Sequence, residues 1–91
     1  MSDPTRAWPH QAERATGSVE NMLALASEIF RSSQADPAQK DAAKKVISSA
    51  RTVMRQKVPT GMQIEVLRLR FASLRATLIN RAGAREHISP P

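Results

Sequence analysis

The chain has 91 residues, of which 41% are apolar and 24% charged, so it forms one small domain at most. Its 14 Lys and Arg against 8 Asp and Glu give a formal charge of +6, which suits acidic proteins, nucleic acids or anionic membrane surfaces as partners. Cysteine is absent, which excludes disulfides, thiolate metal sites and cysteine nucleophiles. The sequence has no apolar secretion signal and no membrane span, so we expect a cytoplasmic protein without membrane association.

The core of so short a chain must be small. Only three residues are aromatic, Trp8, Phe30 and Phe71, so most buried area has to come from aliphatic side chains and alanine. A domain of this size buries a smaller fraction of its surface than a larger one and is correspondingly marginal. We therefore expect a partner or a second copy to add to its stability.

Residues 1–16 are expected to form an N-terminal arm or a short helix. Pro9 suits the first position of a helix, and Gly17 suits the position just after one. Trp8 stands beside this proline and either docks into another subunit or folds back over the open end of the bundle. The second alternative is favoured, because a core with few aromatic residues gains most from covering by a large ring.

Residues 18–33 are predicted to form the first main helix, because their apolar residues recur at helical spacing on one broad face. Ser18 is the candidate N-cap, and Gln34 and Ala35 form the turn that follows. The predicted buried face consists of Val19, Met22, Leu23, Leu25, Ala26, Ile29 and Phe30.

Residues 37–57 are predicted to form the second main helix. Asp36 is placed to cap it, with Pro37 at the first position and Gln39 where a reciprocal capping box needs it. Pro59 disfavours helical geometry at the residue before it, so the helix is expected to end there. The predicted buried face consists of Ala42, Ala43, Val46, Ile47, Ala50, Val53 and Met54.

Residues 61–81 are predicted to form the third main helix, with Thr60 and Gln63 as a second capping box. Its apolar residues fall into two strips. The first follows the spacing of a coiled-coil or bundle seam and consists of Ile64, Leu67, Phe71, Leu74 and Leu78. The second lies roughly 120° to 150° around the helix and consists of Leu69, Ala72, Ala76 and Ile79.

A helix in a small isolated bundle needs only one buried face, but this last helix carries two apolar strips. We therefore expect the second strip to lie in an interface between copies of the chain, although a single wide face in a compact three-helix bundle remains the alternative. Gly83 is predicted to end the helix, and 83–91 is expected to be a tail. The predicted architecture is all-α: a bundle of three main helices over 17–82, preceded by the arm or short helix and assembled into a homo-oligomer.

No catalytic, metal-binding or cofactor-binding pattern is found. His10 and His87 lie far apart near the two ends of the chain, without a carboxylate or cysteine at ligand spacing. The carboxylates are scattered, and no pair is placed as general acid and base. The three glycines stand near predicted helix ends rather than in a phosphate-binding loop. We expect a protein that is not an enzyme and that needs no cofactor.

The second main helix carries a basic strip, Lys40, Lys44, Arg51 and Arg55, whose members fall within about 60° of the helix circumference. No acidic residue interrupts the strip. The third helix adds further arginines, of which Arg68 and Arg75 are the candidate binding residues. Arginine offers a planar fork to carboxylate or phosphate, whereas the plainer alternative is a solvated charged face.

We expect a small helical binding or regulatory module that engages an acidic protein partner through these cations and self-associates through its last helix. The alternative is a nonspecific DNA- or RNA-binding protein that contacts phosphates through the basic strip. Single-stranded recognition is disfavoured, because only Trp8 is a candidate for stacking on bases.

Overall fold

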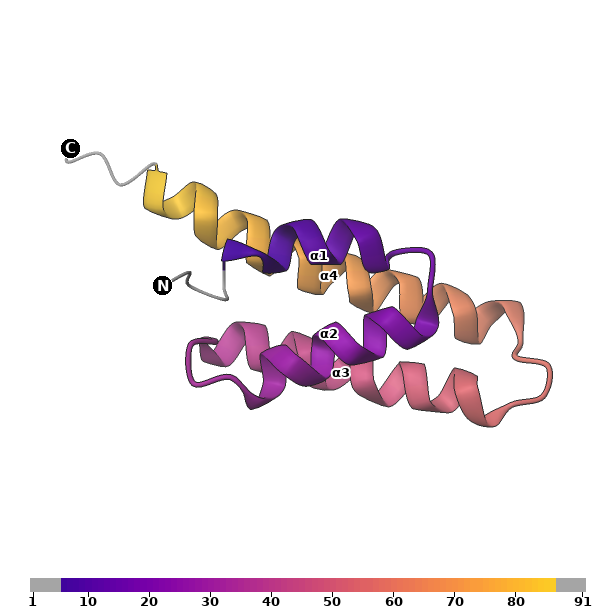
Figure 1. Ribbon diagram of the computed structural model, residues 1–91. Helices are drawn as coiled ribbons and strands as arrows, with labels where there is room; N and C mark the ends of the chain where they lie inside the picture. The colour runs from indigo at the N-terminus through magenta and orange to yellow at the C-terminus, as the bar shows by residue number, and fades with distance from the viewer. Residues whose placement is uncertain (1–5, 87–91) are drawn as a thin grey trace.

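The computed structural model describes residues 6–86, with side chains described as far as residue 79. This part of the chain forms four α-helices and no strand (Figure 1). The helices are α1 Trp8–Ala15, α2 Val19–Arg31, α3 Pro37–Arg55 and α4 Gly61–Glu86. The predicted all-α class is confirmed.

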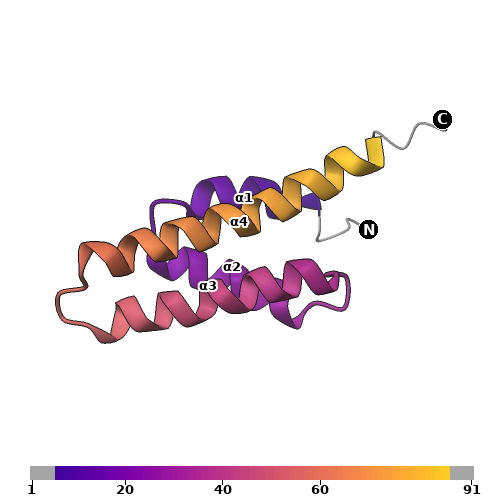
Figure 2. The same ribbon diagram turned by 180° about the vertical axis from the view of Figure 1, so that it is seen from behind.

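The helices run alternately in opposite directions and form two layers. One layer holds α1 and α2, and the other holds α3 and α4, so that α1 lies over α4 and α2 over α3 (Figures 1 and 2). Helix α3 packs along both α2 and α4, whereas the shorter α1 packs against α2 and α4. Short connections of this kind make consecutive helices antiparallel neighbours.

Three helices begin where the sequence places a cap. The Ser18 side chain accepts a hydrogen bond from the backbone N–H three residues on, at 3.3 Å. Asp36 and Gln39 form a reciprocal capping box, with distances of 2.8 Å and 3.1 Å. Thr60 and Gln63 form a second one at 3.1 Å and 2.9 Å. Each cap satisfies backbone donors that the first helical turn leaves unpaired.

The carboxyl ends of the helices follow the sequence less closely. Helices α2 and α3 end at Arg31 and Arg55, two residues before their predicted ends. The prediction that Gly83 ends the last helix is wrong, because α4 continues to Glu86. Glycine costs a helix interior only about 1 kcal/mol, and the Ala, Arg and Glu that follow are strong helix formers. Residues 83–86 of the expected tail therefore belong to α4, and 87–91 lie outside the described residues.

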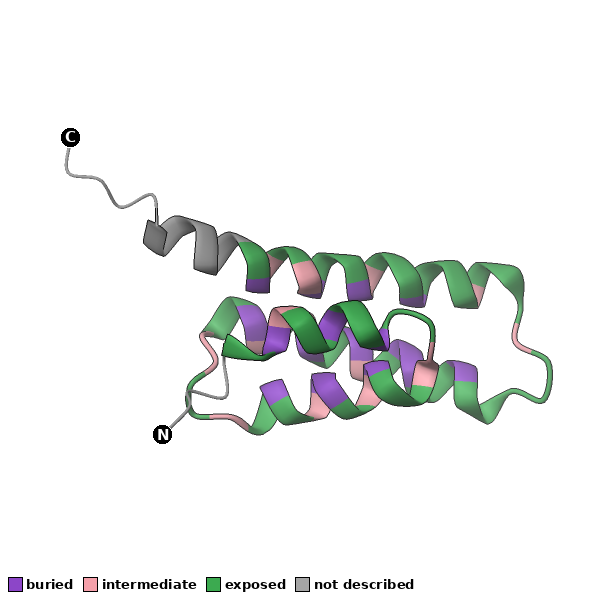
Figure 3. Ribbon diagram, turned by 45° about the horizontal axis from the view of Figure 1, so that its top comes forward, coloured by how far each residue is buried: buried purple, intermediate pink, exposed green. Residues whose placement is uncertain are grey.

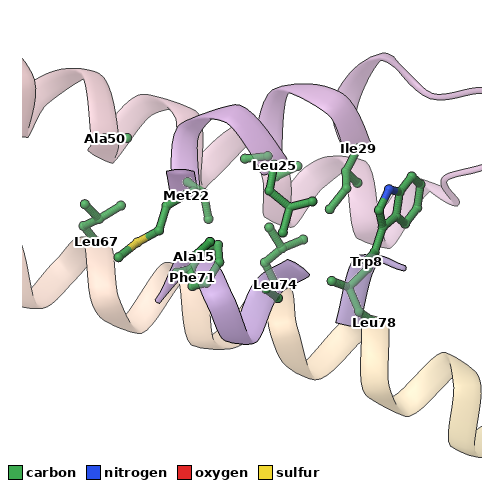
Figure 4. Close-up of a cluster of buried hydrophobic side chains, with 14 of the residues drawn as sticks. Trp8, Ala15, Met22, Leu25, Ile29, Ala50, Leu67, Phe71, Leu74 and Leu78 are labelled. Carbon is green, nitrogen blue, oxygen red and sulfur yellow. The ribbon is translucent and has the colours of Figure 1, made fainter. Parts of the chain in front are cut away.

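The short N-terminal segment is a full member of the bundle rather than an appendage to three helices. Trp8 is only 1% exposed, and Ala12 and Ala15 are also buried. The Trp8 indole N–H donates to Glu28 of α2 at 2.7 Å. Figure 4 shows the indole in the same cluster as side chains of α2 and α4. The expectation that Trp8 folds back onto the bundle is confirmed, and the described chain is a four-helix bundle.

The core lies between the two layers and uses the predicted inner faces of the longer helices. From α4 it takes Leu67, Phe71, Leu74 and Leu78, and from α3 it takes Ala43, Val46, Ala50 and Val53. Three residues predicted to be buried are instead exposed, namely Phe30, Met54 and Ile64. They lie at the margins of their apolar faces, where no neighbouring helix covers them.

Candidate binding surface

The basic strip of α3 lies on the outer side of the bundle. Arg51 and Arg55 are exposed together with Lys44, and Lys40 is half-buried. The inner side of the same helix is defined by its buried apolar residues, Ala43, Val46, Ala50 and Val53. At 100° per residue, the centre of the strip is roughly 130° from the centre of the buried face. The cations therefore point to solvent and do not contribute to the core.

The four cations of this strip form no ion pair within residues 6–79. The ion pair found in that range joins Lys45 to Asp41 at 3.3 Å, on a neighbouring flank of α3 where both side chains are more than half exposed. A surface pair of this kind contributes little to stability. Within the described residues, the positive charge of the strip is therefore not neutralised by an ion pair.

Apolar residues border the strip on the side of α3 that faces α2. Helical spacing places Ile47 and Met54 next to the cations, about 50° and 70° from the centre of the strip. Ile47 is half-buried, and Met54 is 50% exposed. The basic strip is therefore the outer part of a mixed surface.

Phe30 of α2 lies on the same edge of the bundle. It is 44% exposed. On α2 it lies about 160° around the helix from Glu28, the residue that holds the Trp8 indole of α1. Because α2 packs against both α1 and α3, the flank that turns away from α1 is the one beside α3. We call the surface formed by Phe30, Ile47, Met54 and the four cations of the strip the α2–α3 edge.

The two candidate arginines of α4 do not join this surface. The guanidinium of Arg70 marks the side of α4 that faces α3, since it donates to the Ser49 hydroxyl at 2.7 Å and to the Lys45 carbonyl at 3.3 Å. Arg68 and Arg75 lie on the opposite flank of α4. The six cations predicted to bind a partner therefore form two separate groups on different edges of the bundle.

Arg68 and Arg75 border a hollow of about 190 Å³ between α4 and the α1–α2 connection. The hollow is lined by Thr16, Met22, Arg68, Phe71, Ala72 and Arg75. The Nε atom of Arg75 is buried and has no acceptor within the described residues. The Thr16 hydroxyl is already used, because it donates to the Ala12 carbonyl at 2.9 Å. The space is small and holds no carboxylate.

Arg70 has a structural role that sequence reasoning missed. Its guanidinium links α4 to α3 through Ser49, which is one of two buried polar residues in the described part of the chain. The signal in the sequence was a serine at the margin of the mainly apolar stripe of α3. Such a residue needs a polar partner when it is buried.

The second strip of α4 lies on the outer side of that helix. Leu69 is 60% exposed and Ile79 is 48% exposed, and Ala72 and Ala76 are exposed as well. Figure 3 shows that the outer side of α4 is exposed along the described part of the helix, with burial confined to the side toward the other helices. The predicted interface residues are thus accessible in the single chain.

Other kinds of site find no support in the described part of the chain. No group of three or more His, Cys, Asp or Glu side chains there is arranged to hold a metal ion. His10 lies exposed on α1, and His87 is outside the described residues. None of the described helices combines the length and the apolar character needed to cross a membrane. No protein-family model, curated protein or solved structure matches the chain.

Proposed function

We propose that the protein is a small helical binding module that engages an acidic protein partner through the α2–α3 edge. The observation that carries this proposal is that one edge holds both four cations and the apolar residues Phe30, Ile47 and Met54, which are half-buried or exposed. The four cations form no ion pair within residues 6–79. The centres of protein interfaces combine aromatic residues, methionine and arginine in this way.

The partner best suited to this edge is an amphipathic acidic helix or segment. Its apolar side chains would cover Phe30 and Met54, and its carboxylates would meet Lys44 and the two arginines of the strip. Arginine can bind a carboxylate through two parallel hydrogen bonds, which gives the contact orientation as well as attraction. A module of this kind acts by blocking the partner or by bridging it to another molecule.

Nucleic acid fits the same edge less well. Phosphate contacts need cations, but the apolar border would gain nothing from a phosphate backbone. A phosphate-binding surface also gains from a wide field of positive charge, whereas Arg68 and Arg75 lie on another edge of this bundle. The apolar border is therefore the feature that separates the two alternatives.

The proposal is tested with two probes, measured by fluorescence anisotropy at low and moderate salt. The first is a helical peptide of about five turns with a leucine stripe flanked by glutamates, compared with a scrambled peptide of the same composition. The second is a short mixed-sequence DNA duplex. We expect the patterned peptide to bind at least tenfold more tightly than the scrambled one. Equal binding of both peptides, or tighter binding of the duplex with a steep salt dependence, would contradict the proposal.

Matched variants locate the binding edge. Replacing Lys44 and Arg51 with Gln should weaken peptide binding about tenfold, because two charges of the strip are lost. Replacing Lys45 and Arg68 with Gln removes the same charge from other flanks and should change binding less than threefold. Met54→Ser should weaken peptide binding but not duplex binding, whereas Val58→Ser is the apolar control, since Val58 is exposed in the α3–α4 connection and belongs to neither face.

A further inference from the structure

The outer face of α4 carries a regular apolar pattern that no described part of the chain covers. Two rows run along it at seven-residue spacing. One row consists of Met62, Leu69 and Ala76, and the other consists of Glu65, Ala72 and Ile79. Met62 is 78% exposed, and Leu69 and Ile79 are about half exposed or more. Rows with this spacing form the seam of a two-helix coiled coil.

The composition of this face is unusual for a helix that meets only water. Glu65 is the one charged residue on these two rows between residues 62 and 79, and Arg68 and Arg75 lie along one margin. An exposed helix face normally carries charged and polar residues, and a contiguous apolar strip marks an interaction site. Ala72 and Ala76 are small enough for another helix to approach closely.

We propose that α4 pairs with α4 of a second copy of this chain in an antiparallel arrangement. In the register that fits best, Leu69 of one copy packs on Ala72 of the other, and Met62 packs on Ile79. Glu65 then lies opposite Ala76 of the second copy, with that copy's Arg75 next to it. Because the arrangement is twofold symmetric, each of these contacts occurs twice.

Size and charge favour this arrangement over a parallel one. A parallel pair in register would place Glu65 against Glu65 in the seam, where two like charges repel. It would also set Leu69 against Leu69 while leaving two successive alanine layers underfilled. In the antiparallel pair the large Leu69 packs on the small Ala72 of the other copy. The same arrangement brings Glu65 close to Arg75 of the other copy.

The size of the face fits a weak, reversible dimer. From Met62 to Ile79 it is about 26 Å long at 1.5 Å per residue. At a width of about 10 Å on each helix, the contact has a projected area of about 260 Å² per copy, or about 500 Å² for the pair, which is at the low end of weak or transient interfaces. We therefore expect a dimer that dissociates on dilution rather than an obligate one.

Pairing through α4 leaves the α2–α3 edge of each copy open. Arg70 marks the side of α4 next to α3, and the basic strip lies on the flank of α3 that turns away from α4. A dimer would present two such edges, one on each copy. This inference stands on the α4 face alone and does not depend on which molecule the α2–α3 edge binds.

Sedimentation equilibrium over a range of protein concentrations tests whether the dimer forms. The mass should rise from the 10.0 kDa of one chain toward twice that value. Leu69→Asp should raise the dimer dissociation constant at least 100-fold, because it places two charges in the seam. Val58→Asp is the matched control, since Val58 is 83% exposed in the α3–α4 connection and off the seam. A mass that stays at that of one chain at all concentrations would overturn the inference.

Cysteine pairs test the direction of the helices, and the absence of native cysteine makes them unambiguous. Met62→Cys and Ile79→Cys chains, oxidised as a mixture, should form a mixed disulfide dimer. Each variant alone should not, because the two substituted positions of an antiparallel pair of identical chains would be about 26 Å apart, far beyond disulfide reach. Efficient crosslinking of each variant with itself would mean a parallel pair and would overturn the proposed arrangement, as would failure of the mixture to crosslink.

Discussion

Helices α3 and α4 form one layer of the bundle and are built alike, yet their outer faces differ. Both begin with a capping box, and both bury one apolar stripe between the layers. The outer face of α3 carries four cations, whereas that of α4 carries two apolar rows with a single acid. A charged face is stable in water without a partner, so its charge alone does not show that it binds anything. Exposing an apolar face to water costs free energy, so such a face is a candidate for covering by another surface.

The inner faces of the two helices differ as well. Helix α3 contributes small residues, with Ala43, Ser49 and Ala50 buried, while α4 contributes Leu67, Phe71, Leu74 and Leu78. The small residues let α3 lie close to both α2 and α4, and the large ones fill the space between the layers (Figure 4). Most of the apolar area that the core gains from this layer therefore comes from α4.

The largest expected effect is the difference in stability between substitutions on the inner and outer faces of α4. Leu74→Ala, on the inner face, should lower the free energy of unfolding by about 3 kcal/mol, because it leaves a cavity in the core. Leu69→Ala, on the outer face, should change it by less than about 0.5 kcal/mol in dilute solution. Urea unfolding followed by circular dichroism at low micromolar concentration measures both. Similar losses for the two variants would mean that the outer leucine is already buried in the dilute chain.

A smaller effect concerns the link between α3 and α4. Arg70→Gln removes the hydrogen bonds to Ser49 and to the Lys45 carbonyl and should cost about 1 kcal/mol, since a buried hydroxyl loses its partner. Arg68→Gln is the matched change on the other flank of α4 and should cost less than about 0.5 kcal/mol. Thermal unfolding of the two variants side by side gives the comparison. A greater loss at Arg68 would show that the hollow beside it stabilises the fold more than this link does.

The smallest expected effect is the difference in stability between variants that remove the N-terminal caps of α3 and α4. Asp36→Ala should cost about 1 kcal/mol, and Thr60→Ala about half of that, because threonine is the weaker cap and Thr60 is the more exposed of the two. Urea titration of each variant against the unchanged protein measures the difference. If Thr60→Ala proved the more costly, the start of α4 would depend more on its cap than on packing.

Much of the fold follows from patterns that lie within a few residues of one another. The caps at Ser18, Asp36 and Thr60 were predicted correctly, because a cap joins a side chain to a backbone group two or three positions away. The inner stripe of α4 was also predicted, since helical periodicity alone selects it. The end of α4 was not, because glycine permits a helix end without requiring one.

The candidate surfaces were predicted in part. The basic strip lies on one exposed face, as its spacing required, but its apolar border came from Phe30 and Met54, which the sequence had assigned to the core. Arg68 and Arg75 were grouped with the strip by charge, and they lie on another edge. Periodicity defines the centre of an apolar stripe, but it does not say which margin a neighbouring helix covers.

The sequence by itself determined that the described chain is helical, where its helices begin, and which residues centre each inner face. Those properties depend on hydrogen bonds and side-chain spacing within one or two helical turns. Only the tertiary structure decided that Trp8 makes α1 part of the core, that Arg70 links two helices, and that the charged and apolar outer faces belong to different edges. These depend on contacts between residues some 20 to 70 positions apart, which form only when all four helices pack together.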